Sequence, residues 1–152
     1  MEPITIPDLS ARPLGFKVER IMKSQPDVLY RAWTEKFDEW FAEPGTLIMK
    51  AEVNSVFFFE TVFKTSEQSE KMRHPHYGRF LKLVPDSLIE FTWLTGADGT
   101  KGAETVVTIE LEPRDNGTLL SLEHKGFPDE ESKGRHDDAW VMILEYLDEK
   151  MK

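Results

Sequence analysis

Two stretches in the last third of the chain alternate between apolar and polar residues, at 105–111 and 118–124. A period of two is typical of a β-strand with one buried face. After Gly-Phe-Pro at 126–128, apolar side chains instead recur at spacings of three and four. This spacing predicts one long amphipathic helix, Glu130–Met151. Its inward face is expected to carry His136, Trp140, Ile143, Leu144, Leu147 and Met151.

The first third predicts one strand followed by two short helices. Residues 14–21 alternate as a strand, and an apolar stripe that includes Leu29 and Trp33 predicts a helix after it. Ser24 and Asp27 have the spacing of a capping box at the start of that helix. A second short helix is expected at 36–41.

The middle of the chain predicts hairpins and one polar loop. Alternation or continuous apolar character indicates strands at 47–53, Val56–Phe63, 77–84 and 88–94, and residues 64–75 have no periodicity. An antiparallel sheet with one solvated face needs a cover on the other, and only the C-terminal helix is long enough. The expected fold class is α+β, with a curved antiparallel sheet of six to seven strands wrapped around that helix.

Alternation also predicts which side chains of the sheet face the helix. The run Phe57–Phe59 is apolar on both faces, so its outer side is expected to lie under the N-terminal arm or against a second copy, which makes a homodimer plausible. The expected inward set is Leu47, Met49, Ala51, Val53, Tyr77, Leu81, Leu83, Ile89, Phe91, Trp93, Val107, Ile109, Leu111, Leu120, Leu122 and His124.

Composition narrows the class of protein. The 152 residues suit one domain, with an extended, proline-containing arm at 1–13 before a single domain at 14–152. There is no cysteine, signal peptide or apolar run of membrane-spanning length, so we expect a cytoplasmic protein. A formal charge of −9 argues against nucleic acid or an anionic membrane as partner.

Four stretches together resemble the helix-grip fold of the START/Bet v 1-like (SRPBCC) superfamily. More narrowly, they are similar to the activator of Hsp90 ATPase homologue 1-like family, although Asn54-Ser55 stands where members often have paired glycines. The resemblance implies a START-like domain, an internal cavity and a possible chaperone partner. The four stretches are 26–34 with Trp40-Phe41 and Pro44-Gly45, 77–81 with 89–93, 106–113 with 116–118, and 122–129 with His136 and Trp140.

Large aromatic side chains dominate the expected interior. They could line a pocket for a flat or lipid-like ligand, or they could fill a solid core. The candidate cavity residues are Trp33, Trp40, Phe41, Phe57, Phe59, Tyr77, Phe91, Trp93, His124, His136, Trp140, Ile143 and Leu144.

The histidines are the main candidates for chemistry. His124 and His136 could anchor a polar group of a ligand or act as general acid and base, or they could be partnered structural residues. His74 and His76 are expected in an exposed loop, and two histidines are too few for a closed metal site. We find no catalytic triad, phosphate-binding loop or carboxylate pair, and expect no metal or cofactor.

Three functions follow from these observations. The leading hypothesis is a binding protein whose hydrophobic cavity takes a small apolar or aromatic, lipid-like molecule. The second is a chaperone-associated interaction module that acts through its outer surface. The third is an enzyme of the cyclase or hydrolase kind that uses His124 and His136, and the sequence favours binding over catalysis.

Overall fold

The structure is a computed structural model that describes residues 6–63, 72–97 and 99–151. In chain order the elements are β1 (Leu14–Met22), α1 (Pro26–Thr34), the 3-10 helix η1 (Phe37–Glu39), β2 (Val56–Phe63), β3 (Met72–Val84), β4 (Leu88–Trp93), β5 (Thr105–Arg114), β6 (Gly117–Phe127) and α2 (Glu130–Met151).

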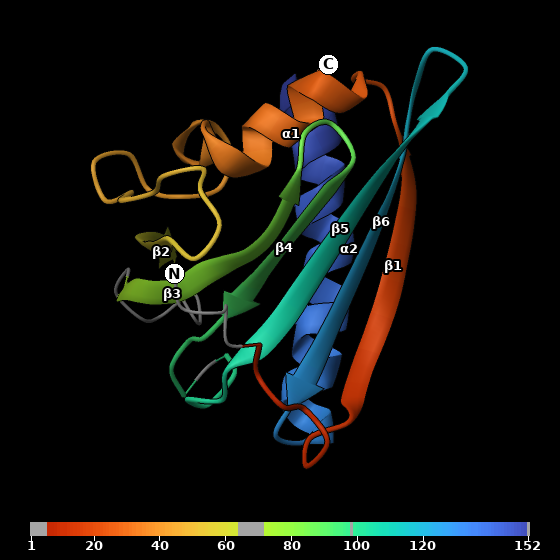
Figure 1. The fold of residues 1–152 in the computed structure, drawn as a ribbon. Coiled ribbons are helices and arrows are strands. Elements are labelled where there is room, and N and C mark those ends of the chain that lie inside the picture. The colour runs from red at the N-terminus through yellow and green to blue at the C-terminus, as the bar shows by residue number, and fades with distance from the viewer. Residues whose placement is uncertain (1–5, 64–71, 98, 152) are drawn as a thin grey trace.

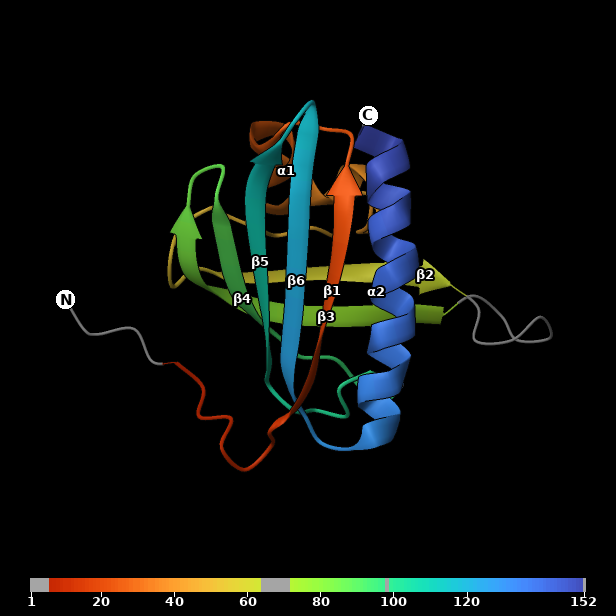
Figure 2. The ribbon, with the colours of Figure 1, turned by 90° about the vertical axis from the view of Figure 1, so that its right-hand side faces the viewer.

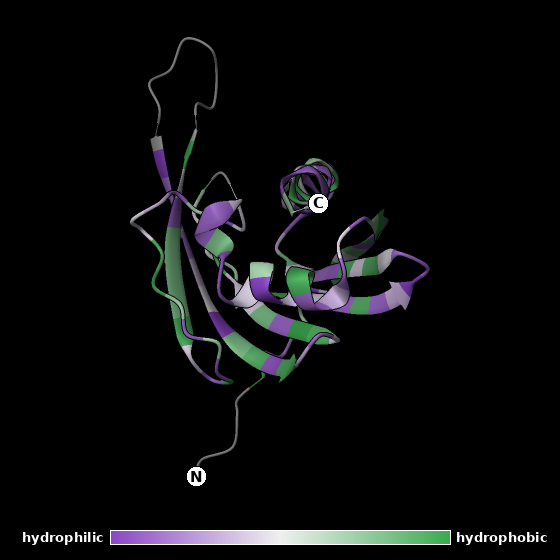
Figure 3. Cartoon of the chain, turned by 90° about the horizontal axis from the view of Figure 1, so that it is seen from above, coloured by the Kyte–Doolittle hydropathy of each residue, from purple (hydrophilic) through white to green (hydrophobic). Residues whose placement is uncertain are grey.

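The strands form one antiparallel six-stranded sheet in the order β1-β6-β5-β4-β3-β2. Figure 1 shows α2 running along one face of this sheet, and Figure 3 shows the sheet as an arc with α2 on its concave side. The expected α+β helix-grip architecture is confirmed. Among the described residues, no helix is long and apolar enough to cross a membrane.

The strand predicted at 47–53 is wrong. Only Ile48 pairs with the sheet, through one bridge to Phe58, whereas Ala51 and Val53 are exposed. The chain turns before β2, and Asn54 adopts a positive φ of 70° that asparagine tolerates better than most residues. Leu47 and Met49 still pack against the core, so two of the four side chains predicted to face inward in this segment do so.

The strand β3 begins earlier than predicted, at Met72 rather than at residue 77. Its register places Phe59 opposite His76 and Thr61 opposite His74, so part of the predicted loop belongs to the sheet. The rest of that loop, 64–71, lies outside the described residues. The second short helix is confirmed only as a single 3-10 turn.

The predicted capping box at the start of α1 is also wrong. Gln25 is the N-cap residue and makes no side-chain cap hydrogen bond. The Ser24 hydroxyl instead donates to the carbonyl of Met151 at 2.6 Å, and the Ser24 carbonyl accepts from Thr118 at 2.8 Å. Ser24 therefore ties the start of α1 to the end of α2 and to β6.

The described part of the N-terminal arm lies beside the ends of β5 and β6 (Figure 2). The Arg12 guanidinium donates to the carbonyls of Gly126 at 2.8 Å and Glu104 at 2.7 Å. Residues 6–13, the described part of the arm, therefore do not cover the outer face of the Phe-rich strand. There Phe58 packs against Tyr77, with ring centroids 5.3 Å apart.

The core fills the space between the sheet, α1 and α2 with aromatic rings. Trp33 on α1 lies at its centre, with ring centroids 5.9 Å from Trp140 and 6.2 Å from Phe91. Fully burying a side chain of this size stabilises the fold by roughly 2–3 kcal/mol. This packing fixes how α2 stands over the sheet.

Candidate ligand-binding site

A cleft of about 800 Å³ opens between the first half of α2 and the β2–β3 hairpin. Figure 2 shows β2 and β3 running across the direction of β1, β5 and β6, so the sheet curls away from the helix at this side. The loop after β4 closes one end of the cleft with small residues, among them Gly96 and Ala97. The curvature of the sheet, rather than a gap in the packing, therefore creates the space.

Three aromatic rings from three different parts of the chain line the cleft. Phe41 follows η1, Trp93 ends β4 and Trp140 lies on α2, and their ring centroids are 5.5–6.3 Å apart. With His136 and Ile143, these are five of the predicted cavity residues. They give the cleft an apolar wall.

Seven other predicted cavity residues lie beneath the cleft rather than in its wall. Their side chains are buried, and six of them belong to the hydrophobic core cluster, so the molecule has both a solid aromatic core and a lined cleft. These residues are Trp33, Trp40, Phe57, Phe59, Phe91, His124 and Leu144.

The inward orientation predicted for Tyr77 is wrong. Its side chain is 46% exposed and packs against Phe58 on the outer face. The sheet register shifts between Phe80 and Lys82, and Leu81 is buried as well as Phe80. Alternation counted back from Leu81 across this irregularity therefore places Tyr77 on the wrong face.

His76 was predicted in an exposed loop, but the structure buries it in the wall of the cleft. Its ring stacks on Phe59, with centroids 4.7 Å apart, and meets Trp93 edge-on at 5.0 Å. Burial lowers the pKa of His76 to about 4. Its Nδ1–H donates to the carbonyl of His74 at 2.8 Å, which leaves Nε2 as an acceptor. Alternation extended back from Phe80 through Gly78 could have found this residue.

His136 has the same hydrogen-bonding pattern on the opposite wall. Its Nδ1–H donates to the carbonyl of Ser132, one helical turn earlier, at 2.8 Å. Burial lowers its pKa below the ordinary value. His136 is therefore a neutral imidazole near pH 7, with Nε2 as an acceptor.

His124 is part of a closed hydrogen-bond network in the core. The Trp140 indole donates to Nδ1 at 3.0 Å, and Nε2–H donates to the Thr105 hydroxyl at 2.7 Å. That hydroxyl donates in turn to the carbonyl of Trp93 at 2.5 Å. Burial holds the pKa of His124 well below its usual range. Both ring nitrogens are used, so His124 and His136 do not form an available acid–base pair.

Thr61 is a residue of the cleft that sequence reasoning missed. It is buried on the inner face of β2, yet its hydroxyl has no hydrogen-bond partner among the described residues. Only the alternation after Phe57 and Phe59 indicates it. A buried hydroxyl without a partner costs free energy, which marks the position as one suited to a ligand.

The charged residues of the cleft lie at its rim. Arg73 pairs with Glu60 at 2.8 Å, and Arg135 pairs with Glu131 at 3.3 Å. Glu43, the third charged residue of the lining, is exposed. Among the described residues, Arg135 Nε is nevertheless buried without a hydrogen-bond partner.

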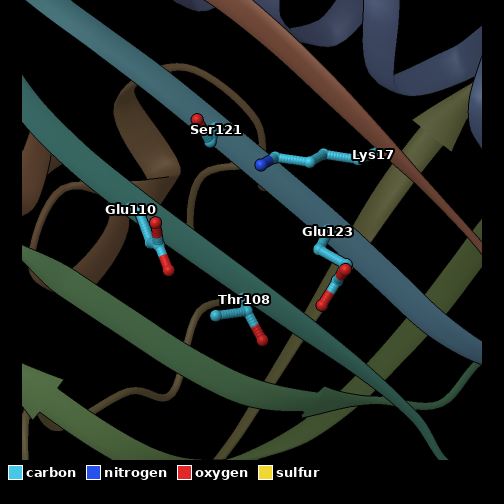
Figure 4. A pocket seen from close by; sticks show the side chains of 5 residues that line it. All are labelled: Lys17, Thr108, Glu110, Ser121 and Glu123. Carbon is cyan, nitrogen blue, oxygen red and sulfur yellow. The ribbon is translucent and has the colours of Figure 1, made fainter.

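A second hollow, of about 70 Å³, lies on the opposite face of the sheet and is lined by side chains such as Lys17, Glu110 and Glu123 (Figure 4). Its hydroxyls are satisfied within the sheet, because Ser121 donates to Glu19 and Thr108 donates to Glu90. In the described ranges, no group of three or more histidines and carboxylates is placed to hold a metal ion. This hollow is part of the solvated face.

The family model described as Activator of Hsp90 ATPase homolog 1-like protein matches residues 23–152. The chain belongs to this family. The match spans every element from α1 to α2 and includes both walls of the cleft, so the resemblance noted in the sequence is confirmed. None of the curated proteins is significantly similar to the chain.

Solved structures share the fold of this Hsp90-activator-like family member. Protein CV1439 from Chromobacterium violaceum is 24% identical over 91% of this chain and 98% of its own, with a TM-score of 0.75. The Aha1 dimer from Colwellia psychrerythraea is 16% identical over 91% and 96%, with a TM-score of 0.64. An Hsp90 activator from Plasmodium falciparum is 19% identical over 84% and 88%, also with a TM-score of 0.64.

Proposed function

We propose that the protein binds a small, largely apolar molecule in the cleft between α2 and the β2–β3 hairpin. The observation that carries this proposal is the cleft itself, whose volume of about 800 Å³ is walled by Phe41, Trp93 and Trp140. Ligand sites are commonly concave, apolar and about 300–1,000 Å³ in volume, with few polar groups. A solid core would offer no such space.

Filling the cleft tests the proposal. Ala139 lines the cleft on α2, whereas Val141 on the same helix is 51% exposed and is not part of the lining. We expect the neutral fluorescent probe N-phenyl-1-naphthylamine to bind the natural protein. Ala139→Phe should weaken binding at least about tenfold, equivalent to 1.4 kcal/mol, and Val141→Phe should change it less than about twofold.

Two results would contradict binding in the cleft. One is the absence of any probe fluorescence change with the natural protein. The other is equal affinity for the natural protein and Ala139→Phe, because a ligand in the cleft must compete with the added ring. Circular dichroism of both variants checks that they remain folded.

The family also supports a second proposal, that the protein acts on an Hsp90-type chaperone. The support is the family description and the fold shared with an Hsp90 activator. The test is stimulation of Hsp90 ATP hydrolysis by the purified protein, with the natural chain and Ala139→Phe side by side. Stimulation by both to the same extent would assign this activity to the surface outside the cleft, and no stimulation would overturn it.

A further inference from the structure

Two polar side chains of the cleft lining, Thr61 and His76, come from neighbouring strands and lie on the same face of the sheet. Thr61 on β2 pairs directly with His74, and Phe59 pairs with His76, so Thr61 and His76 are diagonal neighbours. Diagonal neighbours in an antiparallel pair lie about 7–8 Å apart, a separation that one ligand atom between the two side-chain tips can bridge. Both side chains are only 9% exposed and both line the cleft.

The two groups are complementary in hydrogen bonding. The Thr61 hydroxyl has no partner among the described residues, so it can donate to a ligand oxygen. His76 uses its Nδ1–H on the carbonyl of His74, which leaves Nε2 to accept a proton from a ligand. A hydroxyl group satisfies both, because its oxygen accepts from Thr61 and its hydrogen donates to His76.

The surroundings of this pair select against charge. The two arginines of the lining are already paired, Arg73 with Glu60 and Arg135 with Glu131. An ionised ligand group placed there would lose its hydration without gaining a counter-charge. The rings of Phe41 and Trp93, which line the cleft beside His76, offer an apolar contact for the rest of the ligand.

We infer that the cleft recognises a neutral, flat aromatic molecule through one hydroxyl group held between Thr61 Oγ1 and His76 Nε2. This inference rests on the proposed binding function and adds the chemical class of the ligand. It separates hydroxylated from unsubstituted aromatics of the same shape, which an apolar wall alone does not.

The first test compares three probes of similar size on the natural protein by isothermal titration calorimetry at pH 7. They are 2-naphthol, which donates and accepts, 2-methoxynaphthalene, which only accepts, and 2-methylnaphthalene, which does neither. We expect 2-naphthol to bind about tenfold more tightly than 2-methylnaphthalene, because the analogue leaves the buried hydrogen-bonding groups unpaired. The methoxy compound should fall between them.

The second test changes the protein. Thr61→Val and His76→Phe nearly preserve side-chain shape and remove one hydrogen-bonding partner each. Each substitution should lower the affinity for 2-naphthol roughly 3–10-fold and should change the affinity for 2-methylnaphthalene by less than about twofold. Val141→Phe, on the exposed side of α2, is the matched control and should leave the affinity for both probes unchanged.

The outcomes separate this inference from the function on which it rests. If the three probes bind equally, or if both variants keep the preference for 2-naphthol, the inference is wrong while binding in the cleft stands. If none of the three probes binds, the binding function fails and the inference fails with it. Because the probe series uses the natural protein, an unfolded variant does not remove the test.

Discussion

Two threonines near the cleft show that the energetic role of a hydroxyl depends on its partners. Thr105 accepts from His124 and donates to the carbonyl of Trp93, so its hydroxyl closes a buried network. Thr61 is also buried, but its hydroxyl has no partner within the described structure. The same substitution, Thr to Val, should therefore change stability in opposite directions at the two positions.

Thr105→Val should lower the free energy of unfolding by about 1–3 kcal/mol, because it removes the hydrogen-bond partner of His124 Nε2–H and of the Trp93 carbonyl. Thr61→Val should raise it by about 0.5–2 kcal/mol, because a methyl group replaces an unsatisfied hydroxyl. Urea denaturation of the ligand-free proteins measures both. Destabilisation by Thr61→Val would mean that its hydroxyl is already satisfied in the free protein.

The residue scale also explains which site residues the sequence could indicate. Trp93 and Trp140 are large and apolar at regular spacing, so their inward positions follow from pattern alone, as the structure confirms. Tyr77 fails because one irregularity in the register reverses the faces behind it. Alternation indicates His76 and Thr61 as inward residues, but it does not indicate that β3 begins at Met72 and carries His76 beside the cleft, because residues 64–75 have no periodicity.

At the scale of elements, the C-terminal end of α2 is fastened to the end of β1. Asp148 is buried, accepts from the Arg20 guanidinium at 3.0 Å and accepts from the backbone N–H of Lys23 at 2.8 Å. Ser24 adds its bond to the carbonyl of Met151. These contacts hold the helix against β1 at one end, while its other end stands over the cleft.

Asp148→Ala should lower the free energy of unfolding by about 2–3 kcal/mol, because it leaves the buried Lys23 N–H and part of Arg20 without an acceptor. Glu149→Ala is the control, since it removes an exposed pair with Lys23 that is worth less than about 1 kcal/mol. Urea denaturation with an unchanged m-value measures the difference. Equal effects of the two substitutions would show that the hydrogen bonds of Asp148 with Arg20 and Lys23 contribute little to stability.

Elements with a strong period follow from the sequence, and those with a weak one do not. The bounds of α2 match the predicted range because a spacing of three and four persists over 22 residues. Residues 47–53 alternate as well, but the chain turns at 51–54, where Asn54 has a left-handed conformation, and only Ile48 pairs with the sheet. The sheet-pairing partners of β2 and β3 depend on tertiary contacts that alternation does not encode.

At the scale of the whole molecule, the curved sheet packs closely against α2 on one side and stands away from it on the other. Near α1 and β1 it packs closely enough on α2 to bury Trp33, Leu144 and Leu147. At the β2–β3 side the sheet turns away from α2 (Figure 2), and the cleft is lined by residues of both. The core and the candidate site share Trp93 and Trp140, so only substitutions of lining residues outside the core, such as Ala139, are expected to change binding without unfolding the protein.

The buried histidines also make the whole molecule sensitive to acid. His76, His124 and His136 all have a folded-state pKa below the ordinary 6.5, chiefly because burial disfavours their charged form. Below pH 6.5 the unfolded chain therefore binds protons that the folded chain does not. The contribution of these neutral histidines to the free energy of unfolding is fully present above pH 6.5 and is lost as the pH falls below it.

For His76 this loss should extend from pH 6.5 down to about 4, where the folded protein itself takes up the proton. Each such histidine contributes a slope of roughly 1.4 kcal/mol per pH unit within its window. Urea denaturation at pH 7.5, 6.5, 5.5 and 4.5 measures the total slope. His76→Phe should reduce that slope by about one proton and keep the ring packed on Phe59, because the substitution removes the titrating group alone. An unchanged slope in this variant would show that His76 is already solvated or protonated in the folded protein.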